Sequence, residues 1–254
     1  MHPTPYQQTK AALLALGGQR VWSLMVTLFG DLAQAEGSMI DGPVLSAIMA
    51  EMDVRPEAVR VALHRLRNDG WIASEKHGRT GRHALTSTSR KETTLASARI
   101  YADPLPPNGE WTLALSEDVG DEVGMAQHGF MPLLPRVYLG TGPAPKNTLA
   151  LRGGAVPNWL RGEVAPLMLE PEYAALLPAL QQVHDVLEES TLTPLQTAVL
   201  RCLLVHNWRR IVLRHVALPR DLLPDAWSGH ACHTLVDTLL KRFPRPAIDT
   251  ILPA

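Results

Sequence analysis

Cysteine, aromatic residues and long hydrophobic runs are all scarce in this chain. Two cysteines among 254 residues, Cys202 and Cys232, cannot build a disulfide framework, so we expect a reducing, cytoplasmic location. The longest apolar stretches, at residues 11–16 and 21–29, are separated by Arg20 and fall short of the roughly 18 residues that a membrane span needs. The same interruption argues against a secretory signal. We therefore expect no membrane association.

Motifs that mark common enzyme classes are also missing. Neither glycine-rich segment, at residues 140–142 and 153–154, ends in the Lys-Ser/Thr pair of a phosphate loop. There is no Gly-x-Ser-x-Gly nucleophile elbow. The neighbouring carboxylates Glu188 and Glu189 are most simply surface residues of a helix. These absences predict a protein that is not an enzyme.

The formal net charge of −1 conceals an uneven distribution. Between residues 55 and 91 there are nine Lys and Arg but only three Asp and Glu, a local net charge of +6 that leaves −7 for the rest. Such asymmetry is typical of a segment that meets a polyanion.

The apolar spacing of the N-terminal hundred residues predicts three helices and a hairpin. Residues 7–32 form one helix, or two that break at Gly17 and Gly18, and Asp41 can cap the next helix. Pro56 opens a third helix that ends near Gly70. Two short strands, 71–74 and 83–86, then flank a glycine-rich basic turn at residues 77–82. This is the order of a winged helix-turn-helix.

The third helix would present cations on one face, because positions 60, 64 and 67 are spaced four and three apart. An arginine can donate two hydrogen bonds to guanine in the major groove, and cations on the wing can hold the DNA backbone. The predicted DNA contacts are Arg55, Arg60, His64, Arg67, Lys76, Arg79 and Arg82. The alternatives are a solvated charged face and a winged helix that binds another protein.

The rest of the chain is predicted to form two further domains. Proline and glycine at residues 103–109 mark a boundary. Short β-compatible pieces at 111–115, 136–139 and 148–151 predict a small α+β domain, and helical patterns at 173–189, 194–215 and 231–243 predict a C-terminal helical domain. The expected fold is thus α+β and mainly helical, with domains at 1–102, 110–170 and 171–254.

Segments spread over nearly the whole chain share a further pattern. They lie at residues 23–31, 58–66, 69–71, 204–210 and 227–229, and in this order they resemble the PaaX family of regulators of phenylacetic acid degradation. The resemblance implies a homodimeric repressor with a winged helix, a small ferredoxin-like domain and a C-terminal helical domain. It also implies that phenylacetyl-CoA is the inducer that releases DNA, and it brings no cofactor.

Two departures from that family bear on the ligand. Pro143, Pro145 and the pair Gly153-Gly154 stand where the family has a fuller helix, and Asn207-Trp208 replaces an acidic residue and a tyrosine. An acyl-CoA needs cations for its phosphates and apolar surface for its acyl part. The candidate ligand residues are His206, Trp208, Arg209, Arg210 and Arg214. The alternatives are a core tryptophan with ion-paired arginines, or an enzyme acting on an acyl-CoA.

The C-terminal part also contains residues that could form a zinc site. Cys and His can bind zinc, and such residues gather in two places: Cys202 with His206, and His230 with Cys232 and His233. Structural zinc sites show tighter paired spacing than this, so we expect no metal.

Overall fold

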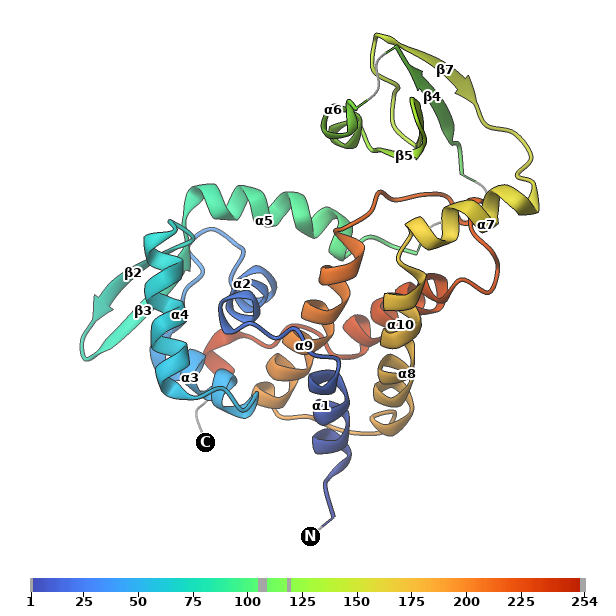
Figure 1. Cartoon of the computed structure of the whole chain (residues 1–254). Coiled ribbons are helices and arrows are strands. Elements are labelled where there is room, and N and C mark those ends of the chain that lie inside the picture. Colours follow the sequence, from blue (N-terminus) through green and yellow to red (C-terminus); the bar gives the residue numbers. More distant parts are fainter. Residues whose placement is uncertain (1, 105–108, 118–119, 252–254) are drawn as a thin grey trace. The chain divides into compact units, whose positions relative to one another are not determined.

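The computed structural model describes residues 2–104, 109–117 and 120–251 (Figure 1). Part of the predicted boundary, residues 105–108, lies outside them. The chain groups into two compact units: the first contains residues 1–102, 178–210 and 235–254, and the second contains 103–177 and 211–234. The predicted span 171–254 therefore contributes to both units. The division into three independently folding domains stays a prediction.

The fold class is α+β and mainly helical, as predicted. The N-terminal part of the first unit contains α1 (Pro5–Ala15), α2 (Val21–Leu32), β1 (Ile40–Asp41), α3 (Gly42–Glu51), α4 (Pro56–Asn68), β2 (Ile72–His77), β3 (Thr80–Leu85) and α5 (Ser87–Ile100). The expected succession of helices and hairpin is present. No helix in the described ranges is long and apolar enough to cross a membrane.

Local sequence explains where the first helices begin and end. The N-terminal apolar segment forms two helices, because Gly17 and Gly18 take positive φ angles of 74° and 73° that other residues avoid. Pro56 occupies the first turn of α4, where its missing N–H costs nothing. Gly70, with φ of 72°, turns the chain out of that helix.

The hairpin differs from its prediction in length. Strands β2 and β3 pair antiparallel as far as His77 opposite Thr80, which leaves a two-residue loop of Gly78 and Arg79. The predicted six-residue turn was too long, and Arg82 lies inside β3. There its Nε donates to Oδ1 of Asp41 at 2.9 Å. Asp41 stands at the N-cap of α3 as expected, but its side chain caps no backbone N–H.

The core of the first unit joins segments far apart in sequence. On α2, Leu24, Met25, Leu28 and Phe29 are at most 1% exposed. The hydroxyl of Thr27 on the same helix lies 3.2 Å from Nδ1 of His206 on α9. Helix α2 therefore belongs to the N-terminal part of the chain and also contacts the C-terminal helix α9.

The C-terminal helices are α8 (Glu170–Val186), α9 (Pro194–Val212) and α10 (Ser228–Arg242), close to the three predicted spans. Two short 3₁₀ helices, Arg220–Leu222 and Ile248–Thr250, follow α9 and α10.

The second unit contains a four-stranded antiparallel sheet in the order β5-β6-β4-β7. Its elements are β4 (Thr112–Ser116), α6 (Glu122–Gln127), β5 (Phe130–Leu134), β6 (Val137–Gly140), β7 (Thr148–Arg152) and α7 (Asn158–Leu167). Ala114, Met125, Phe130 and Tyr138 form its core. The strand order is that of a ferredoxin-like sheet, but residues 141–147, which contain Pro143 and Pro145, form no helix.

Candidate nucleic-acid interface

Helix α4 has one buried and one exposed face. Val59 and Ala62 are 4% and 5% exposed and Leu66 is 1% exposed, so this stripe faces the core. Arg60, His64 and Arg67 are all exposed. The three residues predicted to read DNA therefore share a free face.

The exposed side chains on this face are only weakly engaged. Nη2 of Arg60 lies 3.0 Å from Oε1 of Glu57, and both side chains are 73% exposed. An exposed pair of this kind contributes roughly 0–1 kcal/mol, so Arg60 can exchange it for a base or a phosphate at small cost. Nδ1 of His64 lies 3.3 Å from the amide nitrogen of Asn68.

Arg55 lies at the beginning of the same helix. It occupies the N-cap of α4, is exposed, and makes no capping hydrogen bond with its side chain. A helix N-terminus carries partial positive charge, which a guanidinium at the same end reinforces. Arg55 is thus suited to a phosphate contact.

Sequence reasoning missed Val61, which is 70% exposed beside Arg60. An apolar side chain on a DNA-facing helix can contact the methyl group of thymine. The signal was available, because Val61 falls outside the apolar stripe of Val59, Ala62 and Leu66.

The cations of the hairpin have different environments. Arg79 lies in the two-residue loop and Lys76 lies near the end of β2; both are exposed, and neither forms an ion pair within the described ranges. Arg82 is half-buried and bound to Asp41, so it holds β3 to β1. Of the three predicted wing cations, Lys76 and Arg79 are the two that are free to move onto a DNA backbone.

Strand β3 also contains a buried histidine. His83 on β3 is 8% exposed, and its Nδ1 lies 2.8 Å from the hydroxyl of Ser74. Burial, followed by the positive charge of Arg67, lowers its pKa. His83 is therefore neutral at neutral pH, and the positive charge of the interface comes from its arginines and lysine.

Comparison with known proteins identifies the family. A model described as PaaX-like protein matches residues 20–89, and one described as PaaX-like protein C-terminal domain matches residues 168–251. Together they cover more than half of the chain. The chain belongs to the PaaX-like family. Its N-terminal match contains α2, α3, α4 and the β2–β3 hairpin, that is, the whole exposed cationic surface.

Two individual proteins are similar to this PaaX-like chain. The transcriptional repressor PaaX of Escherichia coli (strain K12) is 28% identical, and the alignment covers 87% of this chain and 79% of that protein. The solved structure of the uncharacterized protein Rv0674 from Mycobacterium tuberculosis superposes with a TM-score of 0.52 over 89% of this chain and 97% of that one, at 16% identity. The second likeness shows a shared fold.

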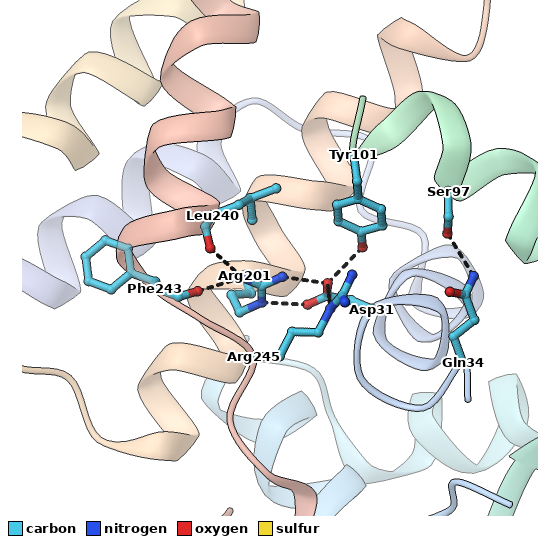
Figure 2. A network of polar contacts seen from close by, with 8 residues as sticks. All are labelled: Asp31, Gln34, Ser97, Tyr101, Arg201, Leu240, Phe243 and Arg245. Atoms are coloured by element: carbon cyan, nitrogen blue, oxygen red, sulfur yellow. Dashed lines mark hydrogen bonds and ion pairs between the residues drawn. The ribbon is translucent and has the colours of Figure 1, made fainter. Parts of the chain in front are cut away.

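The two segments matched by the PaaX-like models meet within the first unit. Figure 2 shows a network around Asp31 of α2, which contacts Arg201 of α9 and Arg245 after α10. Tyr101, which follows α5, donates its hydroxyl to the same carboxylate at 2.8 Å. The N-terminal matched segment is thus bonded to the C-terminal matched segment through buried charge.

The five predicted ligand residues have different environments. His206 and Trp208 are buried, and Nη1 of Arg210 donates to the carbonyl of Gly17 at 2.6 Å. Arg214 belongs to the second unit, where it pairs with Glu172 at 3.1 Å. The remaining one, Arg209, lines a cavity of the first unit.

Each of the two cysteines is buried and lies close to a backbone carbonyl. The Sγ of Cys202 lies 3.7 Å from the carbonyl of Leu24, and that of Cys232 lies 3.4 Å from the carbonyl of Tyr173. Burial, followed by the charge of Glu170, raises the pKa of Cys232 to about 12, and burial also raises that of Cys202. Both are therefore thiols at neutral pH. Within the described ranges, no three Cys, His, Asp or Glu side chains form a group that could hold a metal.

Acidification is expected to destabilise the first unit through His206. Burial, followed by the charges of Arg209 and Arg210, lowers the pKa of His206 to about 4, whereas an unfolded histidine has about 6.5. Because the folded pKa is the lower one, this stability is present above about pH 6.5 and is lost as the pH falls towards 4. We expect a loss of about 2 kcal/mol between pH 7 and pH 5.

Urea unfolding at both pH values measures this loss, with His206→Gln as the comparison. The wild type should lose about 2 kcal/mol more than the variant between the two pH values. His230, whose pKa burial lowers to about 4, contributes equally to both proteins. Identical pH dependence in the two proteins would remove His206 as the cause.

Proposed function

We propose that this PaaX-like protein is a transcriptional repressor that binds double-stranded DNA through a winged helix formed by α2–α4 and the β2–β3 hairpin. This proposal rests mainly on the exposed cationic face of α4, which is followed directly by a hairpin with one free cation in its loop and another near the end of β2. The similarity to a protein named as a transcriptional repressor supports the same function. The role is regulatory and not enzymatic.

In this function α4 enters the major groove. Arg60 and Arg67 donate to base edges. His64 and Val61 lie beside them on the exposed side of α4. Arg55, Lys76 and Arg79 contact phosphates, which fix the position of the protein without reading sequence. Two copies in a homodimer would place their α4 helices on two half-sites of a palindromic operator.

The effector of such a repressor is an acyl-CoA such as phenylacetyl-CoA, and the regulated genes serve catabolism of phenylacetate or related aromatic compounds. The inducer must bind better to a conformation in which the two α4 helices do not match the half-sites, because equal affinity for both conformations would release no DNA. Support for this part comes from the family.

Arg60→Ala is expected to weaken specific DNA binding by about 1–3 kcal/mol, the range for loss of a bidentate base contact. The measurement is a fluorescence-anisotropy titration of the protein's own upstream DNA against a scrambled duplex. Arg152→Ala is the matched control, since Arg152 is an 81% exposed arginine of the second unit. Unchanged affinity and sequence preference in Arg60→Ala would exclude Arg60 from base reading. If the wild type binds no DNA, a protein-binding winged helix becomes the better account.

The double variant Lys76→Ala/Arg79→Ala is expected to weaken native and scrambled DNA alike. Each lost phosphate contact should reduce the slope of log affinity against log salt concentration by about 0.9, so the slope should fall by about 2 in total. Anisotropy titrations at several salt concentrations measure this slope. An unchanged slope would show that the hairpin does not reach the backbone, and a loss confined to native DNA would make its cations base readers.

A further inference from the structure

A cavity of about 240 Å³ lies within the first unit, between α2, α5 and α9. Much of its wall is apolar: Val26 and Gly30 come from α2, Ala96 and Ile100 from α5, and Val205 from α9. None of the functions proposed above uses this cavity. A largely apolar cavity with a few polar groups is the usual form of a small-molecule site.

Its volume limits the ligand. An apolar cavity of about 150 Å³ in another protein holds a benzene molecule, so about 240 Å³ has room for one ring and a short substituent. A complete coenzyme A ester is far larger. Trp71 and Tyr101 also line the cavity, and flat aromatic side chains favour a flat ring.

Arg209 determines the charge of the ligand. It lines the cavity from α9, and its Nη2 donates to the carbonyl and the hydroxyl of Ser23 at 3.1 and 2.8 Å. Its Nε is buried and has no hydrogen-bond partner, and in the described part of the chain no carboxylate pairs with its guanidinium. Burial, followed by opposing contributions from neighbouring groups, lowers its pKa. A partly buried cation without a counter-ion is costly, and an anionic ligand would remove that cost.

Two polar side chains of the wall are bonded to residues outside it. The hydroxyl of Ser97 accepts from Gln34 at 2.8 Å and that of Tyr101 donates to Asp31, as Figure 2 shows. These contacts fix α5 to α2 beside the cavity. Glu92 of α5 also lines it, but this side chain is exposed, so its repulsion of an anion is screened by water.

We propose that this cavity is a binding site for a small monocyclic carboxylate, with the ring among the apolar residues and the carboxylate on Arg209. The site differs from an acyl-CoA site, because a thioester has no charge to offer Arg209 at its acyl end. The ligand enters as the free acid in its ionised form.

The cavity also adjoins the base of the hairpin. The carbonyl of Trp71 accepts from the backbone N–H of Thr86 and from the hydroxyl of Ser89, at 3.1 and 2.6 Å, where β2 begins and β3 ends. A ligand that moves Trp71 therefore changes how the hairpin is held. The consequence, that the carboxylate modulates DNA binding, rests on the proposed function; binding itself does not.

The test is isothermal titration calorimetry without DNA, using benzoate and phenylacetate as probes and phenylacetamide as the neutral counterpart. The wild type should bind at least one acid, and bind phenylacetamide about tenfold or more weakly than phenylacetate, because a hydrogen bond to a charged group is lost. Arg209→Gln should remove this difference. Glu92→Gln should tighten binding of the acid by about twofold to fivefold.

A pair of variants on α5 tests the location. Ala96→Leu places a larger side chain in the cavity wall and should abolish binding, whereas Ala98→Leu, at an exposed position of the same helix, should leave it unchanged. These two variants keep the test valid if Arg209→Gln fails to fold.

Three results would overturn the proposal. The first is the absence of binding heat at about 5 mM acid, which means an affinity weaker than millimolar. The second is equal affinity for the acid and the amide. The third is unchanged binding in Ala96→Leu. Phenylacetyl-CoA is titrated in parallel. If it alone binds and Ala96→Leu abolishes that binding, the cavity holds the acyl part of a thioester and the free-acid proposal is wrong. If an acid binds as described but DNA is not bound, the cavity proposal stands and the repressor function fails.

Discussion

Asp31→Asn is expected to lower the free energy of unfolding by about 3–5 kcal/mol, the cost of leaving a buried charge without its partner. The charge left behind is Arg201, whose side chain is 3% exposed, and Asp31 itself is 1% exposed. In the wild type, Nε and Nη2 of Arg201 donate to the two carboxylate oxygens at 2.9 and 2.8 Å. An amide can accept only at its single oxygen and carries no charge.

The rest of the network makes this loss difficult to repair. Nη1 of Arg201 already donates to the carbonyls of Leu240 and Phe243 at 3.0 and 2.6 Å, so the guanidinium is held in place (Figure 2). Burial alone would raise the pKa of Asp31, but the hydrogen bond and charge of Arg201, with smaller contributions from Tyr101 and Arg245, lower it. The carboxylate is therefore ionised at neutral pH, and its contribution to stability falls only as the pH drops below about 4, its unfolded value.

Chemical denaturation of three variants tests this interpretation. Arg245→Gln is the matched control, because Arg245 donates to the same carboxylate at 3.0 Å but is 49% exposed; we expect a loss of roughly 1 kcal/mol or less. Asp31→Asn/Arg201→Met should recover part of the stability of Asp31→Asn, since no unpaired buried cation remains. Equal losses in Asp31→Asn and Arg245→Gln, or a double variant no more stable than Asp31→Asn, would contradict a buried ion pair as the cause.

The same network shows what the sequence could not reveal. Asp31 and Arg201 are 170 residues apart, and nothing in local spacing or composition connects an aspartate at the end of one helix with an arginine on another. Charge patterns predict which residues face water along one helix. They do not predict which two helices pack together, because that is decided by the tertiary core.

The exposed cationic face of α4, by contrast, could be predicted closely. Residues 60, 64 and 67 share a face because the helix period fixes their directions, and Pro56 and Gly70 mark the ends of α4 through their own backbone preferences. Arg82 could not be placed, because its pairing with Asp41 depends on β1, a strand of two residues.

The elements missed in the second unit have local causes. Strand β5 contains Pro132, which lacks an N–H and argues against a strand, yet β5 lies at the edge of its sheet where proline is tolerated. Helix α6 has only six residues, too few to show a helical period. In both cases tertiary position overrides the local signal.

Trp208→Ala is expected to cost about 3–5 kcal/mol of unfolding free energy, the range for deleting a fully buried aromatic side chain. Trp208 is 1% exposed, and its indole N–H donates to the carbonyl of Ile100 at 2.9 Å, which ties α9 to the end of α5. The sequence predicted this residue as a ligand contact. Its burial places it in the core, which was the alternative interpretation, so the loss should appear without any ligand. The ligand contact stays a prediction.

Trp208→Phe separates the two contributions of this side chain. It keeps a buried ring but leaves the carbonyl of Ile100 without its donor, so we expect a smaller loss of about 1–3 kcal/mol. Urea unfolding of both variants without ligand measures the losses, and calorimetry with phenylacetyl-CoA on the folded Trp208→Phe protein measures the ligand contribution. Near-wild-type stability in both variants, together with weakened acyl-CoA binding in Trp208→Phe, would return Trp208 to the ligand site. Large losses in stability with unchanged binding would show that Trp208 acts by holding α5 against α9, on either side of the cavity that Arg209 lines.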